Sequence, residues 1–167
     1  MDLLQRALDR VLLQDVELDR IEPRQRPKTP ARHWSRAVLM ERIAYLKEMA
    51  RFGNGGELET VRELPGHAAQ LLYRSRTADA ELDLHYANLF VVLHGTATLV
   101  TGGVIKNLRD AGPGKMQGDA IENGTAQQLK QGDVAHVPAS VPFQLQLTGE
   151  QTLSCFVVQI EAPEESK

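Results

Sequence analysis

Two stretches of this sequence carry its clearest structural signal. Residues 81–95 read ELDLHYANLFVVLHG, and residues 132–143 read GDVAHVPASVPF. In the first stretch six residues separate Asn88 from Gly95, and in the second five residues separate Gly132 from Pro138. A glycine close to a short run of strand-forming residues allows a tight turn between strands. Both stretches therefore predict short strands joined by turns.

Residues 57–161 continue this pattern, because polar and apolar side chains alternate with period two between glycine-bearing turns. Many short strands at such spacing are typical of an antiparallel sandwich or a closed barrel. We expect Asn107–Asp119 to be the longest irregular loop, of the kind that covers a barrel mouth. The expected strands are Glu59–Glu63, Gln70–Arg76, Glu81–Tyr86, Leu89–His94, Thr96–Thr101, Gly103–Lys106, Ala126–Lys130, Asp133–Val137, Phe143–Thr148 and Thr152–Ile160.

The N-terminal third has a different pattern. Apolar residues at helical spacing predict one helix over Asp2–Leu18 and another over Arg36–Arg51. The three prolines in Glu22–Ser35 disfavour a helix, so this segment predicts an extended arm, which four Lys and Arg residues make basic. The expected organisation is therefore helices and basic arm in residues 1–56, the β domain in residues 57–161 and a flexible tail in residues 162–167.

Composition and charge narrow the class of protein. Of the 167 residues, 42% are hydrophobic and 25% are charged, and the formal net charge is -3. This composition is typical of a globular protein, and without a basic excess we expect no nucleic-acid partner. The apolar runs are too short to span a bilayer, and no secretory signal is evident, so we expect no membrane partner. The single cysteine, Cys155, can form no internal disulfide. These features predict a cytoplasmic protein in which Cys155 packs in the last strand.

The two stretches resemble the two sequence motifs of the cupins, which are small β-barrels. The cupin motifs are usually written G-x5-H-x-H-x(3,4)-E-x6-G and G-x5-P-x-G-x2-H-x3-N. The intervals from Asn88 to Gly95 and from Gly132 to Pro138 match them, while Ser140 stands in place of the motif glycine. The resemblance implies an all-β fold, a cupin-type antiparallel β-barrel (jelly roll) with an N-terminal helical extension. It also implies a homodimer.

The residues that bind a divalent metal in typical cupins are largely replaced. Asn88 stands at the position of the motif glutamate, and Phe143 stands at that of the fourth ligand, a histidine. With the longer motif interval Glu81 and Asp83 take the two histidine positions, and with the shorter interval Asp83 and His85 take them. Glu81, Asp83 and His85 lie two apart, so on a strand they would point the same way.

A transition metal needs several convergent imidazole or carboxylate ligands. We therefore expect no metal or other cofactor. The alternative is a divalent transition metal held by His85, Asp83 and Glu81.

These residues predict a small-molecule-binding cupin-domain protein without the usual metal centre. The alternative is a cupin enzyme, either a metal-dependent dioxygenase or isomerase, or a metal-free isomerase in which Asp83 and His85 form an acid–base pair. A third reading is a structural or interaction module whose barrel is filled by side chains. The expected ligand-binding residues are His85, Asn88, Tyr86, His136, Phe143 and Phe90.

Overall fold

The computed structural model of this chain describes residues 31–163. The chain divides into a first unit that ends at Trp34 and a second unit that begins at Ser35. In the first unit, the described residues 31–34 form neither helix nor strand. The helix predicted over Asp2–Leu18, most of the basic arm and the end of the tail lie outside the described residues.

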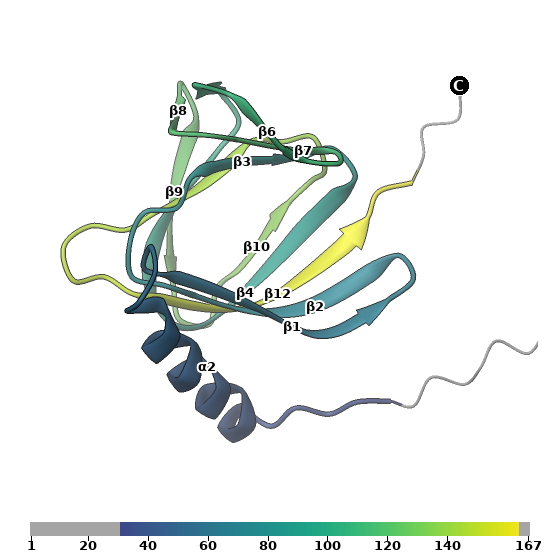
Figure 1. The fold of residues 1–167 in the computed structure, drawn as a ribbon, viewed down its shortest axis with the longest axis vertical. Coiled ribbons are helices and arrows are strands. Elements are labelled where there is room, and N and C mark those ends of the chain that lie inside the picture. The colour runs from purple at the N-terminus through teal and green to yellow at the C-terminus, as the bar shows by residue number, and fades with distance from the viewer. Residues whose placement is uncertain (1–30, 164–167) are drawn as a thin grey trace, which may run out of the picture. The chain divides into compact units, whose positions relative to one another are not determined.

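The described part of the chain contains a helix, α2 (Arg36–Ala50), which agrees with the prediction to within one residue. Ser35 Oγ accepts a hydrogen bond from the Val38 N–H at 3.3 Å and caps the first turn. The helix lies on the outer face of β1 (Gly56–Leu64) and β2 (His67–Arg74) (Figure 1). The apolar cluster between helix and sheet consists of Ile43, Leu46, Ala50, Leu71 and Tyr73.

The strands form a curled antiparallel sheet, which confirms the all-β prediction (Figure 1). Ten strands belong to it, in the order β1-β2-β12-β4-β11-β3-β7-β6, with β9 and β10 also paired to β4. A separate two-stranded ribbon consists of β5 and β8. The remaining strands are β3 (Ala80–Asp83), β4 (Tyr86–Thr101), β5 (Val104–Lys106), β6 (Arg109–Gly112), β7 (Lys115–Gly118), β8 (Ala120–Glu122), β9 (Thr125–Lys130), β10 (Val134–Val137), β11 (Phe143–Gln146) and β12 (Leu153–Glu161).

Strand β4 is one strand of 16 residues, where the sequence predicts two strands and a turn at Gly95. Its first half pairs with β10 and β12, and its second half pairs with β9 and β11. Gly95 has a φ of 87°, and the pairing with β12 shifts register beside it, between Ser154 and Cys155. A side chain at Gly95 would collide with the backbone carbonyl of Thr152. The prediction of a turn is wrong because this glycine bends the strand without ending it.

The predicted irregular loop over Asn107–Asp119 is also wrong, because it contains the β6–β7 hairpin. Strand β7 pairs with β3 along its whole length and so adds to the edge of the sheet. At the hairpin tip, the carbonyl of Gly114 accepts a hydrogen bond from the Leu84 N–H at 2.8 Å. The turn residues Gly112 and Gly114 both have positive φ, so the same glycines that indicate a loop form a tight hairpin turn.

Most of the barrel core is formed by inward-facing side chains of β4, β11 and β12. Leu153 and Cys155 are fully buried in it, and Leu99 is only 2% exposed. Burial raises the pKa of the Cys155 thiol to about 12, so the thiol stays neutral at physiological pH. The predicted packing role of Cys155 is therefore confirmed.

Candidate functional site

A cavity of about 70 Å³ opens inside one end of the barrel, where β3, β4, β7, β11 and β12 meet. It has room for a few water molecules, since one water needs about 10–15 Å³. Charged, amide, aromatic and aliphatic side chains share its wall. The residues that line it are Glu81, Leu82, Asp83, Asn88, Ala111, Lys115, Met116, Gln117, Phe143 and Gln159.

Strands β3, β4 and β11 bring four of the motif positions to this cavity. Glu81 and Asp83 lie two apart on β3, and Phe143, on the neighbouring strand β11, pairs with Glu81. Asn88 lies near the start of β4 and is only 5% exposed. The geometry matches the longer motif interval, because the side chains of Glu81, Asp83, Asn88 and Phe143 all line one cavity.

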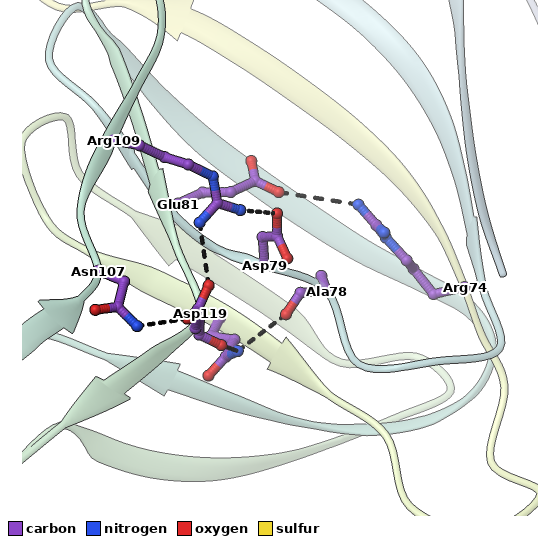
Figure 2. A network of polar contacts seen from close by, with 8 residues as sticks. Arg74, Ala78, Asp79, Glu81, Asn107, Arg109 and Asp119 are labelled. Atoms are coloured by element: carbon purple, nitrogen blue, oxygen red, sulfur yellow. Dashed lines mark hydrogen bonds and ion pairs between the residues drawn. The ribbon is translucent and has the colours of Figure 1, made fainter. Parts of the chain in front are cut away.

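Glu81 is a half-buried carboxylate at the wall of the cavity. Figure 2 shows it facing Arg74, whose Nη2 lies 3.9 Å from Glu81 Oε1. Burial raises the pKa of Glu81, and the positive charges of Arg74 and Lys115 offset only part of that rise. A half-buried carboxyl with a raised pKa at a cavity wall is a feature found at functional sites and also in structural ion pairs.

Asp83 is more deeply buried, with 8% of its surface exposed. Its Oδ1 accepts hydrogen bonds from the backbone N–H groups of His85 and Tyr86, both at 3.0 Å. Its Oδ2 lies 3.7 Å from the Lys115 ammonium. One carboxylate oxygen therefore holds the turn after β3, while the other faces a cation at the cavity.

Two further contacts complete the wall. Gln159, on the last strand, donates a hydrogen bond from Nε2 to Asn88 Oδ1 at 3.2 Å. The Phe143 ring meets Phe90 edge-to-face, with 5.7 Å between the ring centroids and 62° between the planes. Phe90 is 3% exposed and belongs to the core beneath the cavity, so it supports Phe143 and does not line the cavity itself.

The β6–β7 hairpin supplies the residues that sequence reasoning missed. Ala111, Lys115, Met116 and Gln117 all lie on it. A single signal pointed to them, namely the expectation that this segment covers the barrel mouth. Gln159 could have been found as the amide that interrupts the apolar pattern of the last strand.

A network of ion pairs holds this hairpin beside β3. Arg109, on β6, lies between two carboxylates in Figure 2, with Nη2 2.7 Å from Asp79 Oδ2 and Nη1 3.1 Å from Asp119 Oδ1. Asn107 donates to Asp119 at 2.6 Å, and this bond, followed by that from Arg109, lowers the pKa of the Asp119 carboxyl. These contacts are exposed, so they position the hairpin more than they stabilise the fold.

The expectation that Glu81, Asp83 and His85 point the same way is wrong for His85. Strand β3 ends at Asp83, whose carboxylate turns the chain by binding the next two N–H groups. His85 is exposed outside the cavity and packs against Gly114, in a separate groove with Ser140. Asp83 therefore contacts the backbone of His85 and makes no acid–base pair with its imidazole.

Besides His85 and Phe90, two more expected ligand-binding residues lie away from the cavity. Tyr86 is half-buried at the first position of β4, paired with Glu161. His136 is exposed on β10, because its neighbours Ala135 and Val137 take the inward-facing positions. His136 lines a surface groove with Gln127 and Asp133 instead.

Comparisons with known proteins agree with this architecture. No protein-family model matches the sequence, and no curated protein matches it. Among solved structures, the chain is similar to TT1209 from Thermus thermophilus, with a TM-score of 0.50, 13% identity and coverage of 74% of this chain and 95% of that chain. An RmlC-like cupin family protein from Methanocaldococcus jannaschii, with a double-stranded β-helix fold, has a TM-score of 0.46, 17% identity and coverage of 69% and 88%. The cupin domain of Schizosaccharomyces pombe Cnp3 has a TM-score of 0.47, 14% identity and coverage of 64% and 65%.

The curled antiparallel sheet has its motif positions around one internal cavity. The chain has a cupin-type fold. At these identities the similarity concerns the fold alone and carries no activity, substrate or partner with it.

The residues at the cupin metal positions do not fit a transition metal. Phe143 has no donor atom, and Asn88 offers one neutral oxygen, which already accepts a hydrogen bond from Gln159. Both carboxylates face cationic side chains, Arg74 for Glu81 and Lys115 for Asp83. Within residues 31–163, no three His, Cys, Asp or Glu side chains are grouped closely enough to hold an ion.

The described residues include no helix long and apolar enough to cross a membrane.

Proposed function

We propose that this cupin-type protein binds a small polar molecule in the barrel cavity, through its own side chains and without a metal ion. The observation that carries the proposal is the convergence of Glu81, Asp83, Asn88 and Phe143 on one cavity. These positions supply carboxylate and amide groups and one aromatic surface. Such a wall, apolar in part with a few placed polar groups, is typical of small-molecule sites.

Electrostatic balance within the wall supports binding without a metal. In a metal centre the cation compensates the carboxylates. Here Lys115 stands 3.7 Å from Asp83 and Arg74 stands 3.9 Å from Glu81. Side chains of this chain therefore take over the compensating role.

An enzymatic role has less support from this geometry. A dioxygenase or metal-dependent isomerase would need a donor set that these positions lack. A metal-free isomerase based on Asp83 and His85 would need the imidazole inside the cavity, and His85 is exposed outside it. A barrel filled entirely by side chains would not contain this cavity.

A thermal-shift screen on the full-length protein tests the proposal. The probes are small amines, carboxylic acids, sugars and amides, each at several concentrations. A ligand at 100 times its Kd stabilises the native state by about 2.7 kcal/mol, so a true ligand raises the unfolding midpoint progressively. We expect Gln159→Leu, which removes one polar group of the cavity wall, to reduce that rise.

Exposed His136 provides the matched control, since His136→Ala should leave the shift unchanged. Metal analysis of protein purified without chelator runs in parallel. A stoichiometric transition metal whose removal lowers the midpoint would overturn the proposal. The proposal would also be overturned if no probe raised the unfolding midpoint of the wild type by more than it raised the midpoint of Gln159→Leu.

A further inference from the structure

We infer that the β6–β7 hairpin is a flap over the barrel cavity, which detaches from β3 as a unit and gives solutes access to the buried wall. This inference goes beyond the proposed function, because it concerns how the cavity is reached and is tested without a ligand. It rests on the place of the hairpin at the cavity, on how the hairpin is attached to the barrel, and on the anchoring of its base.

The hairpin forms part of the cavity wall. It supplies Ala111, Lys115, Met116 and Gln117, while other strands supply Asn88 and Phe143. Asn88 and Phe143 are both buried in this conformation. A solute can therefore reach these two side chains only if part of the wall moves.

The hairpin is attached to the barrel without apolar anchors. Within residues 31–163, neither apolar core cluster includes a residue of 107–119, whereas β4, β11 and β12 supply most of the barrel core. Among the described strands β6 is the last of its sheet, and all of its residues are exposed. Detachment of the hairpin would therefore break polar contacts without removing an apolar side chain from the core, which is typical of segments that open locally.

Backbone pairing with β3 is the first attachment that has to open. β7 pairs with the four residues of Ala80–Asp83, and at the hairpin tip the Gly114 carbonyl accepts a hydrogen bond from the Leu84 N–H. The Lys115 ammonium adds an ion pair with Asp83 at 3.7 Å. So short a ladder at the end of a sheet opens at a lower free energy than the whole barrel unfolds.

Arg109 provides the second attachment, a strap across the hairpin. Figure 2 shows its guanidinium between Asp79 and Asp119. The pair with Asp79, at 2.7 Å, ties β6 across β7 to the residue that precedes β3. The pair with Asp119, at 3.1 Å, joins β6 to the residue that follows β7, so it can stay intact when the flap opens. The Asp79 pair is exposed, and salt therefore weakens it.

The base of the hairpin is anchored to the buried part of the barrel. Gln144 is only 2% exposed, and its Nε2 donates to the carbonyl of Asp119 at 3.1 Å and to that of Ala78 at 2.9 Å. The Asn107 amide donates to the Asp119 carboxylate at 2.6 Å and so joins the two ends of the hairpin. These bonds fix the point about which the hairpin can swing as one piece.

Amide hydrogen exchange of the full-length protein, followed by NMR at several low urea concentrations, tests the inference. Leu82 and Met116 pair across β3 and β7, and Phe90 and Val157 pair across β4 and β12. We expect the first two amides to exchange at least tenfold faster, after correction for intrinsic rates. Their exchange should also depend less on urea, since opening of the flap exposes less surface than global unfolding. Equal rates and equal urea dependence for the two pairs would overturn the inference.

Arg109→Gln tests the strap. It should accelerate exchange at Leu82 and Met116 about fivefold, because an exposed ion pair that holds the closed state is lost. High salt should accelerate the same amides in the wild type and do so less in Arg109→Gln. Arg42→Gln is the matched control, since Arg42 is about as exposed and pairs with Glu59 between α2 and β1. An equal acceleration by Arg42→Gln would assign the effect to general destabilisation and overturn the role of the strap.

An introduced thiol measures access to the cavity directly. Asn88→Cys places a thiol on the buried wall, and iodoacetamide alkylates it when the flap opens. Cys155 should not compete, because it is fully buried and its pKa is raised to about 12. We expect Arg109→Gln to accelerate alkylation by the same factor as amide exchange.

Alkylation as fast as in the unfolded chain, or unchanged by Arg109→Gln, would show that solutes reach the cavity without movement of the hairpin and would overturn the inference. Neither result bears on the thermal-shift screen. Failure of that screen would overturn the proposed function and leave the flap standing.

Discussion

The two ends of this barrel use equivalent inward-facing positions for different purposes. On β12, Leu153 pairs with Gly95 at the apolar end, and Gln159 pairs with Asn88 at the other end, beside the cavity. Leu153 is fully buried, and Asn88 is 5% exposed, so burial alone does not tell a packing position from a site position. What separates them is hydrogen bonding: buried polar groups need partners, and they leave space between them that apolar side chains would fill.

The largest expected effect comes from removing a core side chain beneath the cavity. Phe90→Ala should lower the free energy of unfolding by about 3–5 kcal/mol, because it leaves a void and removes the edge contact with Phe143. Asn88→Ala, at the next inward position, should cost about 1–2 kcal/mol through the lost bond with Gln159. Urea denaturation of both variants compares a packing position with a neighbouring site position, and equal losses would contradict the distinction drawn between the two kinds of position.

A second effect concerns the turn that separates Asp83 from His85. Asp83→Ala should destabilise the protein by about 1–3 kcal/mol, because the N–H groups of His85 and Tyr86 lose their acceptor. Asp83→Asn keeps a side-chain oxygen and should recover most of this loss. Thermal unfolding of the pair measures the difference, and identical midpoints would show that the turn does not depend on this oxygen.

A third effect, of opposite sign, concerns backbone strain beside the cavity. Ser140 has a φ of 63°, and its N–H donates to the backbone carbonyl of Asp83 at 2.7 Å. Ser140→Gly should raise the free energy of unfolding by about 0.5–1 kcal/mol, since glycine adopts this conformation without strain. Ala139→Gly is the matched control and should lower stability, because Ala139 has no positive φ. A loss of stability in Ser140→Gly would show that its side chain matters more than its strain.

The smallest effect is a pH dependence at Glu81. Its pKa is raised in the folded state, so folding takes up a proton and wild-type stability falls as pH rises above the ordinary value of 4.5. Glu81→Gln lacks this dependence, so its free energy of unfolding relative to the wild type should increase by up to about 0.5 kcal/mol from pH 4 to pH 7. The increase is small because Glu81 is partly exposed. Urea denaturation at both pH values measures it. The control is exposed Glu150→Gln, and an equal gain there would assign the effect to net charge.

Local sequence patterns predicted much of the fold. The apolar stripe over Arg36–Arg51 predicts α2 correctly, since helical spacing is a local property. Period two placed most of the strands within a few residues. It failed at Gly95 and at Asn107–Asp119 because glycine allows both a bend within a strand and a tight hairpin, and pairing partners distant in sequence decide between them.

The site could be predicted only in part. Of the six residues expected to bind a ligand, Asn88 and Phe143 line the cavity. Motif spacing left two assignments open for the other positions, Glu81 with Asp83 or Asp83 with His85, and the structure brings the first pair to the cavity. The prediction failed for His85, because a side-chain hydrogen bond ends β3 two residues earlier than the alternating pattern suggests. It could not identify Lys115, because a lysine in a turn-rich segment looks like any solvated lysine until the hairpin pairs with β3.

By itself, the sequence determined the strand content, the first helix of the barrel unit and the loss of imidazole at the motif positions, because each depends on residue type and short-range spacing. Only the tertiary structure decided which carboxylates share a cavity, which cation faces them and how much space remains. Those properties arise where strands far apart in the chain meet: β3 and β7 pair through backbone hydrogen bonds that any residue except proline can make. No side-chain pattern encodes such a pairing.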